Sequence, residues 1–405
     1  MRLPFLLLFS TLAACGARSS LPVPDAGGDG GAGGSAGGAG GVGGDPGGGG
    51  VGGVEQLALG AAHSCLRTFS GEVYCWGSNT RGQLGSEVGD GSLEPVAVDL
   101  PEPATYLAAG SYHTCAILED RTLYCWGWNR NSQLGVASDA EEIATPVELD
   151  LSPFDDSFPE SIALGERHSC AILRDGAQVG YLVCWGDGGV GQIGPNGNSA
   201  LPTRVASFVD QVACGAFHTC FIGAEILECM GSNEQLQAGV AGPSQLFDPT
   251  MVDLIGPVDL VRSGRGQHTC ARESGTGTLF CWGDNDAGQL GLGFRSEAEL
   301  PTPVTDLSTV TDVAPGFAHT CALEDGVVSC WGDNGSGQLG VAGMGFPSPV
   351  EVPGATSMIA VGTGTVHSCG YRSPTEIFCW GGNDFGQLGD GTTQSSNVPK
   401  QVNIP

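Results

Sequence analysis

Hydrophobic and polar residues alternate with a period of two along most of the chain, in short segments that glycine and proline separate. Residues 96–100, 106–110, 113–118 and 123–127 show this pattern most clearly. Such alternation predicts half-buried β-strands, because the apolar positions of a helix would recur every 3.6 residues instead. We therefore expect an all-β fold of short strands, with these four segments as the strands of one unit.

The strand segments belong to a unit that occurs seven times, each copy marked by a histidine two positions before a cysteine. A second cysteine follows the first after 9 to 14 residues, usually within Cys-Trp-Gly, and a turn such as Gly82-Gln-Leu-Gly85 comes next. The fourth copy departs from the pattern, with Met230 in place of tryptophan. A repeat of about 50 residues with four strands suggests the blade of a propeller.

The recurring Gly-x-x-His and Trp-Gly-x-Asn-x-x-Gly-Gln-Leu-Gly motifs resemble the regulator-of-chromosome-condensation repeat family over residues 54–405. The resemblance implies a seven-bladed β-propeller with four-stranded blades. We interpret residues 54–59 as the second strand of a blade and residues 398–404 as an isolated first strand. We therefore expect the N- and C-terminal strands to pair within one blade and close the ring. The fifth copy has Gly264 four positions before His268 rather than three, so its bend departs from the family pattern.

Sixteen cysteines at regular positions indicate an oxidising compartment. Asp325-Gly326 predicts a type I′ hairpin that places Cys321 opposite Cys330, close enough for a disulfide. The same geometry in each copy predicts the disulfides Cys65–Cys75, Cys115–Cys125, Cys170–Cys184, Cys220–Cys229, Cys270–Cys281, Cys321–Cys330 and Cys369–Cys379. Cys15 and Cys214 remain. We expect Cys214 to be buried and unreactive, with exchange against Cys220 as the alternative.

The histidine and two cysteines of each copy also have the chemistry of a zinc site, as in His63, Cys65 and Cys75. In an exported chain these thiols should oxidise first, so we predict no metal and no other cofactor. A catalytic group normally occurs once in an asymmetric site. The sevenfold repetition of histidine and tryptophan therefore indicates a structural framework rather than catalysis.

The N-terminus carries a targeting signal. Met1 and Arg2 precede a mostly apolar segment, residues 3–14, which is typical of a secretory leader. Leu12-Ala-Ala-Cys15 resembles the lipobox of bacterial lipoproteins, which implies cleavage after Ala14, a lipid on Cys15 and an outer-membrane location in the cell envelope. An ordinary cleavage site is the alternative. We predict a leader at 1–14, a lipidated cysteine with a glycine-rich tether at 15–53, and the propeller at 54–405.

The charge balance removes several function classes. The chain has 15 basic and 44 acidic residues, a net charge of −29, which disfavours nucleic acid as a partner. Membrane contact should be limited to the lipid anchor, because no apolar run is long enough to span a bilayer. Nucleotide exchange on a nuclear GTPase, which the family resemblance implies, is disfavoured for an exported protein. We expect a monomer.

The variable positions within the regular framework are the best guide to function. The Gly-x-x-His bends and the loops after Trp-Gly-x-Asn should open on one face of the disc, where many variable side chains are aromatic or arginine, the types enriched at binding hot spots. The residues on this predicted partner-binding face are Tyr112, Arg167, Phe217, Arg265, Gln267 and Phe317 from the bends and Arg81, Trp128, Arg130 and Phe385 from the loops. We predict a non-enzymatic module that binds a protein or a glycan. The alternatives are an inhibitor of an extracellular enzyme or an extracellular enzyme, which an acidic cluster on the axis would favour.

Overall fold

The computed structural model describes residues 53–154, 156–254 and 256–404. The predicted leader at 1–14, the predicted lipid site Cys15 and the glycine-rich tether up to residue 52 lie outside the described residues. Within the described part of the chain, no helix is long and apolar enough to pass through a lipid bilayer.

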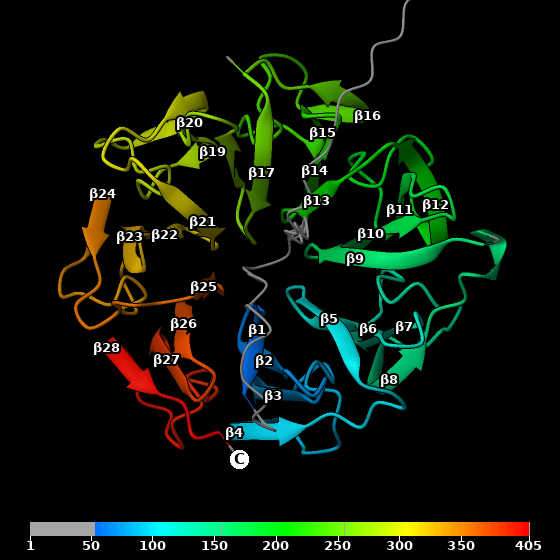
Figure 1. The fold of residues 1–405 in the computed structure, drawn as a ribbon, viewed down its shortest axis with the longest axis horizontal. Coiled ribbons are helices and arrows are strands. Elements are labelled where there is room, and N and C mark those ends of the chain that lie inside the picture. The colour runs from blue at the N-terminus through cyan, green and yellow to red at the C-terminus, as the bar shows by residue number, and fades with distance from the viewer. Residues whose placement is uncertain (1–52, 155, 255, 405) are drawn as a thin grey trace, which may run out of the picture. The chain divides into compact units, whose positions relative to one another are not determined.

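The described residues form 28 β-strands and one short 3-10 helix, Ser152–Phe154. The strands make seven four-stranded antiparallel sheets, which Figure 1 shows as blades around a common axis. The innermost strands are β1 (Val54–Leu59), β5 (Ala104–Ala109), β9 (Phe158–Leu164), β13 (Gln211–Cys214), β17 (Val258–Ser263), β21 (Val310–Pro315) and β25 (Ala360–Thr363). The second strands are β2 (His63–Thr68), β6 (His113–Leu118), β10 (His168–Arg174), β14 (His218–Gly223), β18 (His268–Glu273), β22 (His319–Glu324) and β26 (His367–Ser373).

The two outer positions of each blade complete the sheets. The third strands are β3 (Val73–Ser78), β7 (Leu123–Trp128), β11 (Gly180–Gly186), β15 (Ile226–Ser232), β19 (Leu279–Asn285), β23 (Val327–Asp333) and β27 (Glu376–Gly381). The outermost strands are β4 (Gly91–Ala97), β8 (Glu142–Glu148), β12 (Ser199–Ser207), β16 (Gln245–Met251), β20 (Ser296–Pro303), β24 (Gly345–Glu351) and β28 (Ser396–Gln401). The predicted seven-bladed, four-stranded β-propeller is confirmed.

Burial falls from the axis outwards, as the contrast between the buried strand β1 and the exposed strand β4 illustrates. Every outermost strand carries a proline one position before the residue that faces the second cysteine of its blade. The seven prolines are Pro95, Pro146, Pro202, Pro249, Pro301, Pro349 and Pro399. Proline has no N–H to donate, so these residues keep the exposed strand edges from pairing with another chain.

The predicted pairing of the N- and C-terminal strands is wrong. Strand β1 forms a blade with β2, β3 and β4, whereas β28 forms one with β25, β26 and β27. The error lies in where one copy ends and the next begins: residues 96–100 were grouped with the second copy, but β4 pairs with β3 of the first. The described propeller starts at an innermost strand and ends at an outermost one, so each blade is continuous in sequence.

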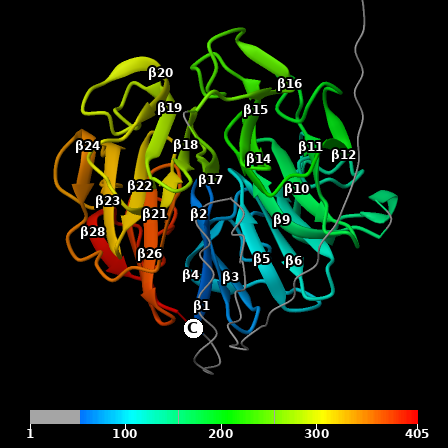
Figure 2. The same cartoon turned by 45° about the horizontal axis from the view of Figure 1, so that its top comes forward.

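The ring closes through contacts between complete blades. Strand β1 lies beside β25 and β26 in Figure 1, and Figure 2 shows β1 and β26 side by side from a second direction. The Val54 N–H donates to the carbonyl of Pro374 at 2.8 Å, and the Tyr371 hydroxyl donates to the carbonyl of Glu55 at 2.9 Å. Leu57 packs with Ala360 and other apolar residues of the last blade in one core cluster. Closure therefore requires no shared sheet.

The second and third strands of each blade carry the predicted disulfide. Asp325 and Gly326 both have positive φ angles, 48° and 80°, as a type I′ turn requires, and Cys321 faces Cys330 across the hairpin. All seven predicted pairs are bonded, with Cα atoms 4.1 Å apart. Cys214 is a free cysteine and is buried, as expected.

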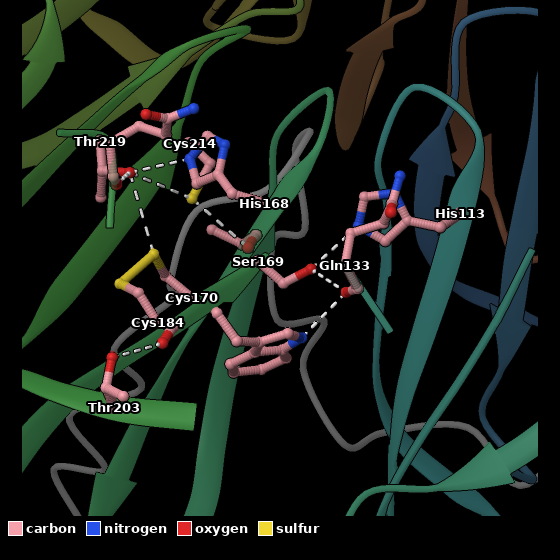
Figure 3. Close-up of a disulfide and its surroundings, with 12 residues drawn as sticks. His113, Gln133, His168, Ser169, Cys170, Cys184, Thr203, Cys214 and Thr219 are labelled. Atoms are coloured by element: carbon pink, nitrogen blue, oxygen red, sulfur yellow. Dashed lines mark hydrogen bonds between the residues drawn. A yellow bond between two sulfur atoms is a disulfide. The ribbon is translucent and has the colours of Figure 1, made fainter. Parts of the chain in front are cut away.

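The seven repeat histidines form a closed ring of hydrogen bonds from blade to blade. Each Nε2 atom lies 2.7–3.0 Å from the hydroxyl of the Ser or Thr that follows the histidine of the next blade. That hydroxyl donates to the carbonyl of the Gln in the Gly-Gln-Leu-Gly turn or its equivalent, as Figure 3 shows for Ser169 between His113 and Gln133. The pairs are His63–Thr114, His113–Ser169, His168–Thr219, His218–Thr269, His268–Thr320, His319–Ser368 and His367–Ser64.

These hydrogen bonds determine which nitrogen of each repeat histidine carries the proton. A hydroxyl has one proton, and because each hydroxyl gives it to a glutamine carbonyl, it must accept from Nε2–H of the histidine. Each Nδ1 atom is then the unprotonated one, and all seven Nδ1 atoms are buried without a partner. Burial lowers the pKa of six of these histidines to about 3 and places that of His63 well below its ordinary value.

We expect the ring to make stability depend on pH. Because the folded-state pKa lies below the unfolded value of about 6.5, the unfolded chain binds more protons below pH 6.5. The stabilisation is complete above pH 6.5 and is lost as the pH falls towards 3, by about 1.4 kcal/mol per pH unit for each histidine. Urea denaturation at pH 7 and pH 5 measures the loss. A histidine that titrates near pH 6.5 in an NMR titration of the folded protein would contradict the assignment.

Candidate binding face

The bends between first and second strands and the loops between third and fourth strands lie on one face of the propeller. In the first blade, Leu59 faces Ser64, His63 faces Gly77 and Ser78 faces Gly91, so all four strand ends meet at the same edge. The equivalent registers recur in the other blades. We call this face, formed by the bends and these loops, the bend face. The bends and these loops open on one face of the propeller, as predicted.

The bends are held close to the axis. In six blades the bend has three residues, and its first residue, glycine, donates its N–H to the carbonyl of the repeat histidine at 2.7–2.9 Å. A Cβ atom at Gly60 would overlap the ring of His63, so the position requires glycine. The next residue bonds to the neighbouring bend, as Ala61 N–H does to the carbonyl of Ser111 at 3.1 Å. Such bonds join six of the seven described blade junctions.

The loops after Trp-Gly-x-Asn are held by their asparagine. The Asn79 amide donates to the carbonyls of Ser86 and Gly89 at 3.0 and 2.9 Å, and its oxygen accepts from the N–H of Leu84 at 3.0 Å. Asn129, Asn233, Asn285, Asn334 and Asn383 anchor their loops in the same way. Side chains between these anchors, such as Arg81, are therefore presented on a rigid support.

Arginine and aromatic side chains from four consecutive blades form an alternating row, which we call the ladder. The guanidinium carbons of Arg81 and Arg167 lie over the Trp128 ring at 6.0 and 5.9 Å from its centroid. Arg167 also lies over Phe217 at 5.7 Å, and Tyr112 meets Trp128 edge-on at 5.7 Å. Cation–π contacts of this kind contribute about 0.5–1 kcal/mol each at exposed sites.

The ten predicted face residues differ in exposure. Tyr112, Phe317 and Phe385 are 37%, 53% and 50% exposed. Arg81 and Arg130 are also exposed, whereas Trp128, Arg167, Phe217 and Gln267 are half-buried. The structure thus joins Arg81, Tyr112, Trp128, Arg167 and Phe217 in the ladder. Phe317 and Phe385 stand on the bend of the sixth blade and the loop of the seventh.

The predicted exposure of Arg265 on the partner-binding face is wrong, because the residue is only 9% exposed. The bend of the fifth blade has four residues, 264–267, and the described structure has no bond there from the first glycine to His268. The extra residue lets Arg265 turn inward across the ring, where an Nη atom donates to the carbonyl of Ala109 in the second blade at 2.6 Å. Burial lowers the pKa of its guanidinium to about 9.

A second buried arginine, Arg262, was not identified from the sequence. Arg262 and Asp312 form an ion pair at 3.2 Å between the innermost strands of the fifth and sixth blades, and both are buried. Arg262 faces the first cysteine of its blade, a position that is small in the other six blades: Ala58, Ala108, Ala163, Ala213, Ala314 and Gly362. An alignment of the seven repeats would have identified Arg262, because it is the one arginine at a position where the other six copies have alanine or glycine.

One group has the residue types of a metal site. Ligand atoms of His168, Cys170 and Cys214 lie within 4.8 Å of one another (Figure 3). The sulfur of Cys170 is bonded to Cys184, however, and the Cys214 thiol donates to the carbonyl of Ala163 at 3.4 Å. Burial raises the pKa of Cys214 to about 12, so the thiolate that a metal needs is disfavoured. The group does not fit a metal ion in this oxidation state.

Models of the regulator of chromosome condensation (RCC1) repeat match most of the blades. One matches residues 70–117, 120–172, 276–323 and 376–405, and a second matches 54–83, 105–133, 160–192 and 310–338. Together they cover more than half of the chain. The chain belongs to the RCC1 repeat family. Residues 193–275, which these models do not match, contain Cys214, Met230, Arg262 and Arg265.

Two curated relatives illustrate the similarity. The chain is 29% identical to human E3 ubiquitin-protein ligase HERC2 over 359 residues, which are 82% of this chain and 7% of HERC2. It is 28% identical to the Arabidopsis thaliana ultraviolet-B receptor UVR8 over 281 residues, which are 66% of this chain and 62% of UVR8. The chain therefore spans less than two thirds of either relative.

Solved structures show the same RCC1 fold. Yeast RCC1 (Prp20) bound to Kap60 matches with a TM-score of 0.74 at 20% identity, over 83% of this chain and 85% of that one. Human WBSCR16 matches with a TM-score of 0.72 at 23% identity, over 82% and 95%. At these identities the likeness concerns the fold alone.

We expect the thiol of Cys214 in this RCC1-repeat protein to be unreactive while the protein is folded, because burial raises its pKa and covers its sulfur. In a Cys15→Ser variant, a thiol reagent at pH 8 should find no rapidly reacting group in buffer and one in denaturant. A further Cys214→Ala substitution should remove that one. Two or more thiols in denaturant would contradict the disulfide pairing.

Proposed function

We propose that this RCC1-repeat protein is a binding module of the bacterial cell envelope, whose bend face holds a partner protein. The observation that carries the proposal is the ladder, in which Arg81, Trp128 and Arg167 come from three consecutive blades. Arginine, tryptophan and tyrosine are enriched at protein-binding hot spots. One protein with this fold, yeast RCC1 (Prp20), has a solved structure bound to Kap60 and has binding properties towards Gsp1p and histones, which supports an interaction role for the fold.

A protein suits this face better than a glycan. Sugar rings stack on open aromatic faces, but two guanidinium groups lie over Trp128 and Tyr112 meets it edge-on. Arg81 and Arg167 lie 3.8 and 3.3 Å from the carboxylates of Glu142 and Glu166, and carboxylates of a partner can exchange with these partly exposed pairs. Exposed Tyr112 and Phe317 can enter apolar pockets of a partner. A glycan stays the second candidate.

The envelope location rests on the predicted lipid site Cys15 and is supported by the seven disulfides, which persist in oxidising compartments. With a net charge of −29, nucleic acid is not part of the proposal. We propose a monomer, because the exposed outermost strands carry prolines that oppose edge pairing.

We propose binding rather than catalysis. An acidic cluster on the axis would have favoured an enzyme, but the buried charges identified there are Arg262, Arg265 and Asp312, and the aspartate is paired with Arg262. Inhibition of an extracellular enzyme is one form that binding to a protein partner can take.

We expect a Tyr112→Ala/Phe317→Ala double variant to lose the partner, because both side chains are exposed on the bend face. The full-length protein is used to capture partners from the native envelope, mass spectrometry identifies them, and biolayer interferometry measures affinity. Loss of two hot-spot side chains should weaken binding about tenfold or more.

The matched control is Phe208→Ala/Ile226→Ala. These residues are 68% and 50% exposed and lie at the opposite face, where β12 ends and β15 begins. Equal retention of the partner by both double variants would rule out the bend face as the binding surface.

A further inference from the structure

Arg265 is a buried cation without a matching anion. Two arginines of the described chain are buried, and Arg262 is paired with Asp312. Among the described residues, no acidic side chain lies within 4.0 Å of the Arg265 guanidinium. One of its Nη atoms donates to the carbonyl of Ala109, and its Nε–H is buried without a partner.

The surroundings of Arg265 supply no compensating charge. The titratable groups that its charge affects are His63, His113 and His367, whose pKa values it lowers further after the larger effect of burial. These histidines belong to the first, second and seventh blades, so the guanidinium lies across the axis from its own fifth blade. Burial of an unpaired charge is costly, so such a group is normally paired.

Arg265 lies directly beneath the bend face. Its hydrogen-bond acceptor Ala109 directly precedes the bend 110–112, which carries Tyr112 of the ladder. Arg265 itself belongs to the bend 264–267 and is 9% exposed, and the same bend carries half-buried Gln267, whose side chain accepts from Gln237 at 3.2 Å. Arg81 and Arg167 share this face but lie 3.8 and 3.3 Å from the carboxylates of Glu142 and Glu166. Exposed Arg130 has no such partner among the described residues and adds positive charge to the face.

We propose that Arg265 is a carboxylate-binding site at the centre of the bend face, which receives an Asp or Glu side chain of the partner protein along the propeller axis. A planar carboxylate can accept from the free Nε–H and a neighbouring Nη–H together, the fork geometry that distinguishes arginine from lysine. The site rests on the proposed function, because the carboxylate belongs to the partner of the bend face. It adds the chemistry of the partner: an acidic loop rather than an apolar or basic one.

The site is tested first without the partner. The Arg265 Nε–H resonance of the ¹⁵N-labelled protein is followed by NMR during titration with a blocked tri-glutamate peptide, with a blocked tri-glutamine peptide as the neutral probe. We expect a saturable shift with tri-glutamate alone. No shift, or the same shift with tri-glutamine, overturns the proposal. A shift with oligogalacturonate but not with tri-glutamate overturns the assignment to a protein carboxylate.

The variants separate a binding group from a structural one. Arg265→Gln removes the charge, and Arg295→Gln is the matched control, an exposed arginine on the bend face of the same blade. Replacement of a buried unpaired charge should leave the thermal midpoint unchanged or raise it. A clear fall with Arg265→Gln, not seen with Arg295→Gln, would mean that Arg265 is structural and overturn the proposal.

The partner then gives the decisive measurement. We expect Arg265→Gln to weaken binding about 30-fold or more, and Arg265→Lys to restore little, since lysine lacks the fork. Unchanged affinity in Arg265→Gln together with loss in Tyr112→Ala/Phe317→Ala would overturn this inference and leave the proposed function standing. Unchanged affinity in both would overturn the proposed function as well.

Discussion

The propeller depends on one hydrogen-bonded unit that joins each blade to the next. A buried histidine donates to a Ser or Thr hydroxyl of the following blade. That hydroxyl in turn donates to a glutamine carbonyl of the blade that carries the histidine, as in His63, Thr114 and Gln83. In six blades the indole N–H of the repeat tryptophan donates to the same carbonyl. Because the unit also joins His367 to Ser64, the last blade meets the first as any other pair does. The ring needs no strand exchange between the chain ends to close.

This unit explains most of the repeated residues. The turn glycine Gly85 has a φ of 70°, and a Cβ there would meet the indole nitrogen of Trp126 in the next blade at 2.7 Å, so both the backbone and the packing require glycine. In six blades the asparagine of the loop fixes the turn that presents the glutamine carbonyl; the third blade has Gly188 at this position. The disulfide ties together the two strands that carry the histidine and the tryptophan. The residues between these fixed points are the ones that differ from copy to copy.

The local parts of the structure could be predicted from the sequence and the long-range parts could not. Strand alternation and the Asp325-Gly326 turn set the register that pairs Cys321 with Cys330, and this information lies within ten residues. The boundary between copies could not be read in the same way, because a tandem repeat looks alike from any starting point. Only the pairing of β4 with β3 decides it. The direction of Arg265 and its bond to Ala109 join residues 156 positions apart, beyond any local pattern.

The departures from the repeat gather in one part of the ring. Cys214, Met230, Arg262 and the additional bend residue beside Arg265 all fall within residues 193–275, the longer of the two stretches of the propeller that the family models leave unmatched. The substitution of methionine for tryptophan removes a hydrogen bond. Met230 cannot donate to the carbonyl of Gln192, and among the described side chains only Thr219 donates to this carbonyl. The other six blades keep the hydrogen bond from the tryptophan indole to the glutamine carbonyl. The loss of this bond at Met230 indicates that residues 193–275 are selected for something other than the regular repeat structure.

Sevenfold symmetry gives a propeller seven equivalent surfaces, whereas a specific partner needs one distinct orientation. The two arginines of the fifth blade break that symmetry at the axis, where every blade meets, and so define a unique direction on an otherwise regular ring.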